Sequence, residues 1–550
     1  MAKVLTIKPK KKRLNVVRKD SKGAILKEIE KEIANLDRRQ KQGAIETPIG
    51  PQRIRGLAGS GKTVVLALKA AYLHAQHPEW DVVVTFHTRS LQGNLQELMR
   101  RFSYEQTNDE PDWQKLRVLS SWGGLRDPGV YSEVAVQAGV QPEDFDTARR
   151  QFGRSDAFEG ICSKVLDAID SNALEPLYDA ILIDEAQDFG PNFLRLCLAA
   201  VKEPKRLVWA YDEMQNLNAL TMPPLEELFG TDEHGRAKVT LRNDENQPRQ
   251  DVILPKCYRN TPWALAVAHA LGFGCFRPQG LIQAFDEPGM WDDIGYHVVA
   301  GRLEPGHEVS LERRPDASPD FFIKWLSGEQ AVQFHAFEDD ETQLAWLVDS
   351  IQENLSTDEL EPTDIMVIIP NPLSTQQRAS QILYALHNAG IEAHIAGVTR
   401  SRDEFFVDGS VVLTGLFRAK GNECPMVYVV NADYCYGGAG LISKRNTLFT
   451  AITRSRGWVR IAGVGDDMQA LYAEYSKIVD AGYELRFRMP TDEERQRMRQ
   501  MHRDRTASEQ EKLEKTRHSL GDVVELFESG IISPEDLSPE MRARLKKFLI

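Results

Sequence analysis

Short apolar runs alternate with segments of helical periodicity in two separate parts of the sequence. In the first part, the run 81–86 and the runs at 116–119, 179–183 and 206–211 are bounded by polar loops. Strands that read as almost unbroken apolar runs are typical of parallel sheets covered by helices on both faces. The pattern therefore predicts an α/β lobe built on a parallel sheet.

A second alternating series begins at Ala331 and ends at Ala462. Strands that alternate with helices predict crossover connections, and therefore a second parallel α/β lobe. The strands are expected at 332–337, 365–369, 393–396, 411–414, 426–430 and 458–462, with helices at 341–354, 375–390 and 448–456.

Segments of different character flank and interrupt the two lobes. Residues 27–42 predict one charged amphipathic helix, and 126–177 are helical and polar like an insertion. Five prolines between 272 and 327 predict an irregular inserted subdomain. The expected organisation is a basic segment and helix over 1–50, a first lobe over 51–255 with an insertion at about 126–177, a second lobe over 256–490 with a small insertion at about 273–330, and a helical tail over 491–550.

Composition limits the classes of protein to consider. A chain of 550 residues with 42% hydrophobic and 27% charged residues predicts two to four globular domains. No apolar run approaches about 18 residues, and no secretory signal is recognisable, so we expect a cytoplasmic protein. Six scattered cysteines without a C-x-x-C pair favour a reducing compartment over a zinc or iron–sulfur site.

The overall charge neither indicates nor excludes a nucleic-acid partner. The net charge is -13, yet a basic groove is a local feature and net charge is a sum. The basic run 8–13 has three interpretations: a contact to a phosphate backbone, a targeting signal, or a solvated chain end.

The segment 55–63 has the G-x-x-x-x-G-K-T spacing of a phosphate-binding loop. Gly56, Gly59 and Gly61 allow backbone N–H groups to turn towards a triphosphate, where side chains would collide. Lys62 is expected to reach the β- and γ-phosphates, and the Thr63 hydroxyl to hold Mg²⁺. The alternative is a glycine-rich turn that contains a lysine by chance.

Two adjacent acids follow the apolar run 179–183. The carboxyl ends of strands are where doubly wound sheets bind ligands. We expect Asp184 to hold Mg²⁺ and Glu185 to act as general base on the attacking water. The alternative is a strand that runs into an ordinary acidic turn. Gln215, after the next strand, is placed to sense the γ-phosphate.

In this order, the motifs resemble those of superfamily-one helicases of the UvrD/PcrA/Rep kind. The resemblance covers residues 36–465 through separate motifs. They are 36–44 (the Q motif), GLAGSGKT (motif I), TFHTRSL (Ia), ILIDEAQDF (II), 258–261 (the YRS/T element of motif IV), 414–423 (V) and 449–455 (VI).

The resemblance implies two RecA-like P-loop NTPase domains with inserted subdomains and a helical tail, using ATP and Mg²⁺. Tyr258 would stack on adenine, and Glu423 would contact the ribose. Arg259 and Arg454 would reach the γ-phosphate from the second lobe, and Gln187 with Gln215 would couple phosphate state to the strand. The implied catalytic set is Lys62, Glu185, Gln215, Arg259 and Arg454, and the nucleotide set is Gln40, Gly56, Gly59, Ser60, Gly61, Lys62, Thr63, Tyr258, Gly421 and Glu423.

A single-stranded nucleic acid would lie across both lobes. Such tracks combine aromatic stacking with donors to phosphates. The expected contacts are Phe86, His87, Thr88, Trp122 and Arg418. For Phe86 and Trp122, a place in the hydrophobic core is the alternative, and for Gln40 it is an ordinary surface position.

Three departures from the family pattern limit the prediction. The family's motif III reads GDxxQSIYxFRGA, whereas residues 210–219 lack its aromatic–arginine pair. The second-lobe insertion is small, which leaves strand separation open. No D/E-x-K nuclease cluster is found, so cutting would require a partner protein.

The sequence as a whole predicts an ATP-dependent translocase or helicase on single-stranded DNA. The 3′–5′ polarity and a place in a DNA repair or anti-phage defence complex come from the resemblance. Two alternatives stay open: an ATP-gated scaffold that controls a partner protein through 491–550, and RNA as the track.

Overall fold

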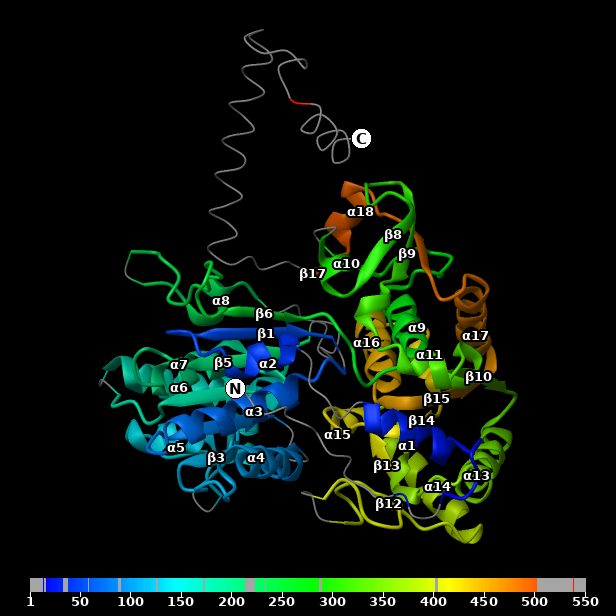
Figure 1. The fold of residues 1–550 in the computed structure, drawn as a ribbon, viewed down its shortest axis with the longest axis horizontal. Coiled ribbons are helices and arrows are strands. Elements are labelled where there is room, and N and C mark those ends of the chain that lie inside the picture. Colours follow the sequence, from blue (N-terminus) through cyan, green and yellow to red (C-terminus); the bar gives the residue numbers. More distant parts are fainter. Residues whose placement is uncertain are drawn as a thin grey trace.

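The computed structural model describes residues 16–501, except 33–37, 58, 88–90, 125–126, 172–173, 213–222, 233, 286–288 and 401–403, together with Arg13 and Ser538. The described chain forms two lobes that lie side by side, each built on one six-stranded sheet (Figure 1). The α/β class with two parallel sheets is therefore confirmed.

The sheet of the first lobe has the order β3-β2-β4-β5-β1-β6, and all its strands are parallel. Ile181 and Ile183 face one core, while Ala180 and Leu182 face the core on the other side. Because successive side chains point to opposite faces of a strand, this continuous apolar run buries both. The strands are β1 (Gln52–Gly56), β2 (Val82–Phe86), β3 (Leu116–Ser120), β4 (Ala180–Ile183), β5 (Leu207–Tyr211) and β6 (Asp251–Leu254).

Helices cover both faces of this sheet. Those on the first face are α2 (Arg38–Ile45), α3 (Lys62–Gln76) and α4 (Gln92–Thr107). Those on the second face are α5 (Val130–Gln137), α6 (Phe145–Ser171), α7 (Pro191–Ala200) and α8 (Leu225–Phe229). The helices α5 and α6 lie within the segment 126–177, for which the sequence predicts a helical insertion.

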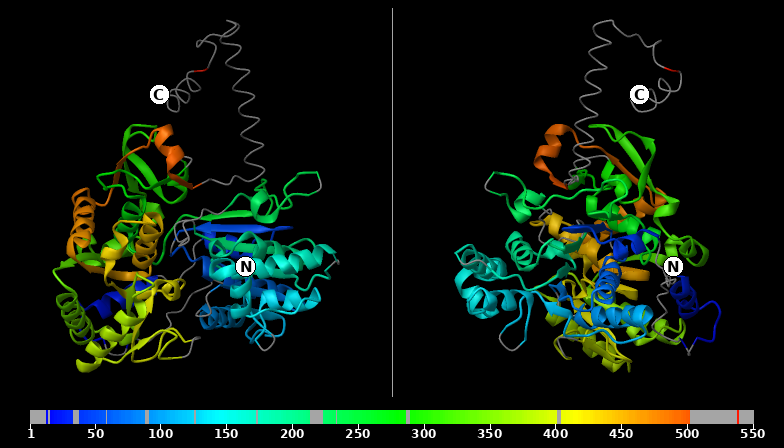
Figure 2. Two further views of the ribbon diagram at one scale, coloured as in Figure 1. Left: turned by 180° about the vertical axis from the view of Figure 1, so that it is seen from behind. Right: turned by 60° about the vertical axis from the view of Figure 1, so that its left-hand side comes forward.

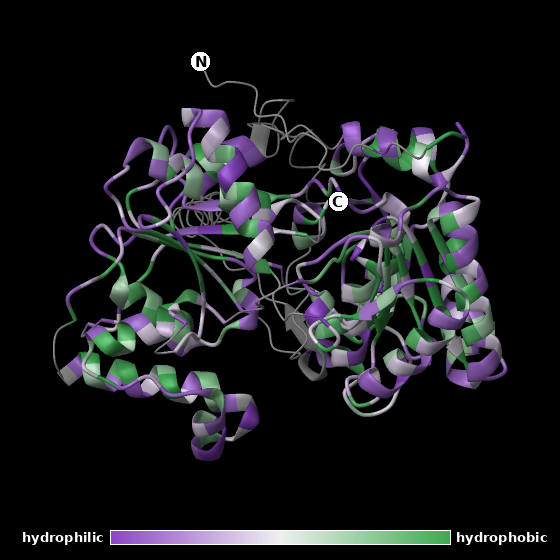
Figure 3. Cartoon of the chain, turned by 90° about the horizontal axis from the view of Figure 1, so that it is seen from below, coloured by the Kyte–Doolittle hydropathy of each residue, from purple (hydrophilic) through white to green (hydrophobic). Residues whose placement is uncertain are grey.

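The second lobe repeats the design with the strand order β10-β15-β14-β11-β13-β12, again parallel. Figure 3 shows apolar strands between helices whose outer surfaces are hydrophilic. The strands are β10 (Val332–Phe337), β11 (Ile365–Ile369), β12 (Ala393–Ile395), β13 (Val411–Gly415), β14 (Cys424–Val429) and β15 (Ser455–Val464). The helices are α9 (Pro262–Phe273), α13 (Asp340–Ser356), α14 (Thr375–Asn388), α15 (Leu416–Ala419), α16 (Leu441–Ile452) and α17 (Gly465–Asp480).

The insertion in the second lobe is more regular than the sequence predicts. An antiparallel sheet of order β16-β9-β8 joins the insertion to residues 485–488, which follow the second lobe (Figure 2). In addition, β17 pairs with β7. The prolines that suggested irregular structure flank the strands, and Pro305 lies in the loop between β8 and β9. The elements are β7 (Gln283–Phe285), α10 (Gly289–Asp293), β8 (Tyr296–Gly301), β9 (Glu308–Arg313), α11 (Phe321–Trp325), α12 (Gly328–Ala331), β16 (Leu485–Arg488), α18 (Asp492–Arg497) and β17 (Arg499–Met501).

The N-terminal helix α1 (Lys22–Glu32) docks on the second lobe, not on the first (Figure 1). Leu26 and Ile29 are fully buried there in a core shared with β11. The sequence predicts one helix over 27–42, whereas the structure has α1 on one lobe and α2 on the other. The residues before the phosphate-binding loop therefore contact both lobes.

The predicted tail lies almost entirely outside the described residues. Within the part of the chain that the structure describes, no helix is both long enough and apolar enough to cross a membrane.

Candidate functional site

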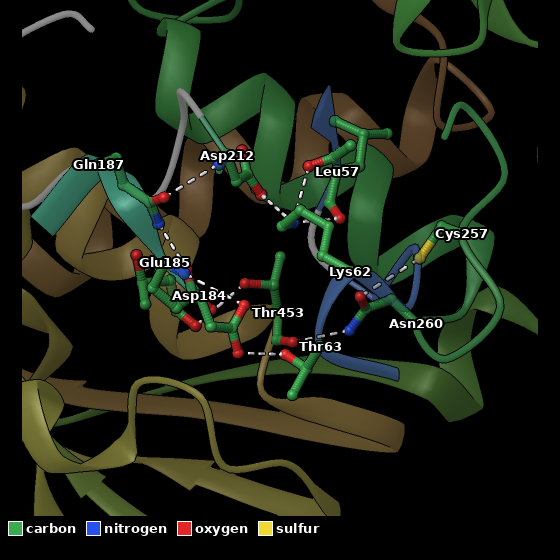
Figure 4. Close-up of polar contacts among 12 residues, drawn as sticks. Leu57, Lys62, Thr63, Asp184, Glu185, Gln187, Asp212, Cys257, Asn260 and Thr453 are labelled. Carbon is green, nitrogen blue, oxygen red and sulfur yellow. Dashed lines mark hydrogen bonds and ion pairs between the residues drawn. The ribbon is translucent and has the colours of Figure 1, made fainter. Parts of the chain in front are cut away.

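The loop between β1 and α3 turns back on itself through its glycines. Gly59 and Gly61 have φ angles of +70° and +87°, which residues with a Cβ rarely adopt. A Cβ on Gly56 would lie 2.4 Å from the Ser60 hydroxyl oxygen. The Lys62 ammonium donates to the carbonyls of Gly56 and Leu57 at 2.8 and 3.0 Å, so it is held over the loop (Figure 4).

The acidic turn lies directly opposite this loop. The Thr63 hydroxyl donates to Asp184 Oδ2 at 2.8 Å, across 121 residues of sequence (Figure 4). Glu185 has a φ of +52°, an uncommon conformation for a residue with a side chain, and it accepts a hydrogen bond from the Gln187 amide. The parallel sheet brings these groups together because β1 and β4 both end at this edge.

Asp212, which directly follows β5, belongs to the same polar cluster. Asp212 lies 3.8 Å from the Lys62 ammonium, and its backbone N–H donates to Gln187 Oε1 at 3.2 Å. Gln187 therefore bridges Glu185 and the end of β5 (Figure 4). Gln215, the predicted phosphate sensor after β5, lies outside the described residues.

Asp184 and Glu185 are both buried, but their pKa values are shifted in opposite directions. Burial and the neighbouring charge of Glu185 raise the pKa of Asp184 well above its ordinary value. Burial also acts to raise the pKa of Glu185, but the charges of Lys420, Lys62 and Arg454 outweigh it and lower that pKa. Thr63 and Asp184 form an oxygen donor set that fits Mg²⁺, and a cation beside Asp184 would favour its ionised form.

Two arginines, Arg259 and Arg454, lie on the side of the cluster that faces the second lobe. Arg259 donates to Glu423 Oε2 at 2.6 Å. Burial acts against the charge of Glu423, but Arg259 and then Arg454 lower its pKa overall. The Arg454 guanidinium is buried and donates from Nε to the Thr450 carbonyl at 3.1 Å. The predicted ribose ligand and both predicted γ-phosphate ligands are therefore neighbours.

The lobes also contact each other through Lys420, Asp188 and Leu91, which have no predicted role, and through Gly421, which is predicted to bind nucleotide. Lys420 pairs with Asp188 across the interface. A Cβ on Gly421, whose φ is +79°, would lie 2.5 Å from a Leu91 methyl group of the first lobe. The sequence shows only that Lys420 and Asp188 carry opposite charges in motifs expected on different lobes, which does not identify them as a pair.

The remaining nucleotide candidates surround the loop. Gln40 is buried, and its amide donates to the Ser60 carbonyl at 2.7 Å, so it is not the ordinary surface residue of the alternative interpretation. The Tyr258 backbone N–H donates to the Gly59 carbonyl at 3.0 Å. The Lys256 ammonium lies 5.4 Å from the centre of the Tyr258 ring. The structure thus brings Gln40 and Tyr258 to the phosphate-binding loop.

The predicted nucleic-acid contacts that the structure describes differ in how far their side chains are available to a ligand. Phe86 is fully buried in the first core, which favours the core alternative and leaves no ring face for a base. Trp122 stacks on Phe158 at 5.0 Å between ring centres and donates to the Glu143 carbonyl, so it packs within the helical insertion.

The other three predicted contacts are His87, Arg418 and Thr88, of which the structure describes the first two. His87 is exposed at the end of β2, and its ring meets that of Phe189 at 5.5 Å. Arg418 is half-buried, with its guanidinium close to Gly397. Thr88 lies outside the described residues. His87 and Arg418 therefore keep a surface for a ligand, whereas Phe86 does not.

Part of the second lobe is similar to a known domain family. Residues 410–462 match the UvrD-like helicase C-terminal domain. The resemblance to UvrD-like helicases is confirmed. The UvrD-like segment runs from β13 almost to the end of β15 and contains Lys420, Glu423 and Arg454. It indicates a helicase-type function and nucleic-acid binding.

One solved structure, the C-terminal domain of a possible DNA helicase from Lactobacillus plantarum WCFS1, is 21% identical to this chain. The match covers 28% of this chain and 86% of that one, with a TM-score of 0.21. No curated protein matches the chain.

Proposed function

We propose that this chain is an ATP- and Mg²⁺-dependent translocase or helicase on single-stranded DNA, built from two RecA-like domains. The observation that carries the proposal is that the second lobe reaches the polar cluster of Lys62 and Glu185: Lys420 pairs with Asp188, three residues after Glu185. The Arg454 and Lys62 charges both act on the Glu185 carboxylate. Groups from two lobes around one reacting phosphate are what a motor driven by lobe closure requires.

Each residue has a role that follows from its chemistry. Lys62 and the loop amides bind the triphosphate, and Tyr258 with Gln40 holds the base. Glu185 accepts the proton of the attacking water, and Arg259 with Arg454 stabilises the charge that develops on the transferred phosphoryl group. Thr63 and Asp184 would hold Mg²⁺, which neutralises phosphate charge when bound.

The test measures ATP turnover of the purified full chain with and without single-stranded DNA. Glu185→Gln keeps the shape of the side chain but removes the base, so we expect turnover to fall about 100-fold or more while DNA binding is retained. The matched control is Glu175→Gln, an exposed glutamate of the same lobe, which should leave turnover unchanged. DNA-stimulated hydrolysis that survives in Glu185→Gln would overturn the proposal.

The same preparation distinguishes the finer alternatives. Stimulation by RNA in place of DNA would identify RNA as the track. Turnover without strand separation on a 3′-tailed duplex would indicate a translocase, or a switch that controls a partner protein through 491–550.

A further inference from the structure

Asn260 is a buried amide at the junction of the two lobes, 1% exposed. Its Nδ2 donates to two carbonyls of the second lobe, those of Thr453 at 2.8 Å and Ser455 at 2.7 Å. The residue between these two carbonyls is Arg454. One side chain therefore holds the backbone on both sides of Arg454.

The other side of the same amide faces the phosphate-binding loop. Asn260 Oδ1 accepts from the Cys257 thiol at 3.4 Å (Figure 4). A Cβ on Gly59 would lie 2.4 Å from Oδ1, so the loop backbone and this oxygen are in direct contact. The neighbouring Tyr258 N–H donates to the Gly59 carbonyl at 3.0 Å. Asn260 is thus packed between the loop of one lobe and the end of α16 in the other.

The chemistry of the position suits an asparagine. Two carbonyls need two N–H donors, and a primary amide offers both on one nitrogen with an acceptor on the opposite side. The last carbonyls of a helix lack partners inside that helix, so the amide also satisfies groups after α16 that are otherwise buried. Asn260 is not required to cap α9, because the Thr261 hydroxyl accepts from the Ala264 N–H at 3.2 Å.

We propose that Asn260 is a positioning residue, which holds Arg454 at the distance from the phosphate-binding loop that turnover requires. The inference rests on the proposed ATPase function, because Arg454 would act on the transferred phosphoryl group. Asn260 touches neither nucleotide nor metal in this role and acts only through the backbone around Arg454. A shift of about 1 Å in a positioned group is enough to cost a rate factor of about 100.

The experiment is a double-mutant cycle on ATP turnover of the full chain. Asn260→Asp keeps the size of the side chain but presents an oxygen to the two carbonyls, and we expect kcat to fall about 100-fold with KM for ATP changed less than about threefold. Arg454→Ala should cost about 1000-fold or more. Because Asn260 acts through Arg454, adding Asn260→Asp to Arg454→Ala should lower kcat no further, within about twofold.

Two additional variants keep the outcome interpretable. Asn260→Ser is uncharged and retains one donor, so its kcat should lie between those of the wild type and Asn260→Asp. Asn354→Asp is the control: Asn354 is a buried amide of the same lobe, bonded to Asp358 and Tyr428, and its change should lower the melting temperature without changing kcat.

The possible failures are distinguishable. If the two losses multiply in the double variant, or if both Asn260 variants keep wild-type kcat, the role of Asn260 is overturned while the ATPase assignment stands. If Arg454→Ala itself keeps wild-type turnover, the proposed function fails and the role of Asn260 fails with it.

Discussion

The Lys420 ammonium of the second lobe forms an ion pair with the Asp188 carboxylate of the first lobe. The two residues are 232 positions apart, and their side chains are only 4% and 17% exposed. Lys420 also lowers the pKa of Glu185, so its charge acts on the acidic turn as a whole. A charge pair removed from water in this way depends on both partners being present.

Replacing Lys420 should therefore loosen the contact between the lobes. In Lys420→Ala the partly buried Asp188 carboxylate loses its partner, which favours separation of the lobes and hydration of the acid. We expect a longer mean distance between fluorophores placed on the two lobes, and ATP turnover reduced about 10- to 100-fold. The control is Lys477→Ala, an exposed lysine on α17. Unchanged distance and turnover in Lys420→Ala would show that the pair does not hold the lobes together.

The docking of α1 predicts which lobe depends on the N-terminal residues. Leu26 is 1% exposed in the core of the second lobe, so Leu26→Ala should cost about 2–5 kcal/mol of stability there. Hydrogen exchange should rise in β11 and not in β1. Val17→Ala in the same N-terminal segment is the control, because that side chain is 85% exposed. Faster exchange confined to β1 would contradict the observed docking.

Asp251 should make the stability of the first lobe dependent on acid pH. Burial opposes its charge, but Arg53 and Arg55 outweigh this and lower its pKa from 3.8 to about 2. Because folding lowers the pKa of Asp251, the ionised carboxylate stabilises the folded protein at every pH above the pKa that it has in the unfolded chain. That stabilisation, about 2 kcal/mol, is lost as the pH falls from about 4 to about 2.

The measurement compares wild type with Asp251→Asn in urea titrations. At pH 7 the variant leaves two arginines without their carboxylate, and we expect a loss of about 3–5 kcal/mol. At pH 3 the difference from wild type should shrink by about 1 kcal/mol, because part of the wild-type stabilisation is already lost. Asp244→Asn, in an exposed pair with Arg242, should cost less than about 1 kcal/mol at either pH. A difference that does not change with pH would contradict the assignment.

The motifs predicted most of the polar cluster around Lys62 because its residues occur in pairs that are close in sequence. Lys62 and Thr63 open one helix, and Asp184 and Glu185 directly follow one strand, so local structure alone places each pair. The strand signal succeeded for the same reason, since strands buried on both faces are apolar throughout. The same apolar signal did not predict β8 and β9. The strand β8 is an exposed edge strand, and prolines flank the hairpin that it forms with β9.

The sequence by itself determined the two α/β lobes, the phosphate-binding loop and the acidic turn, because periodicity and spacing encode local conformation. Only the tertiary structure decided that α1 lies on the second lobe, that Phe86 is a core residue, and that Lys420 meets Asp188. It also decided that Asn260 lies between Gly59 and Arg454. The burial of Phe86 depends on how helices pack on its own sheet. The other relations depend on packing between segments hundreds of positions apart in sequence, which carry no local signal of their contact.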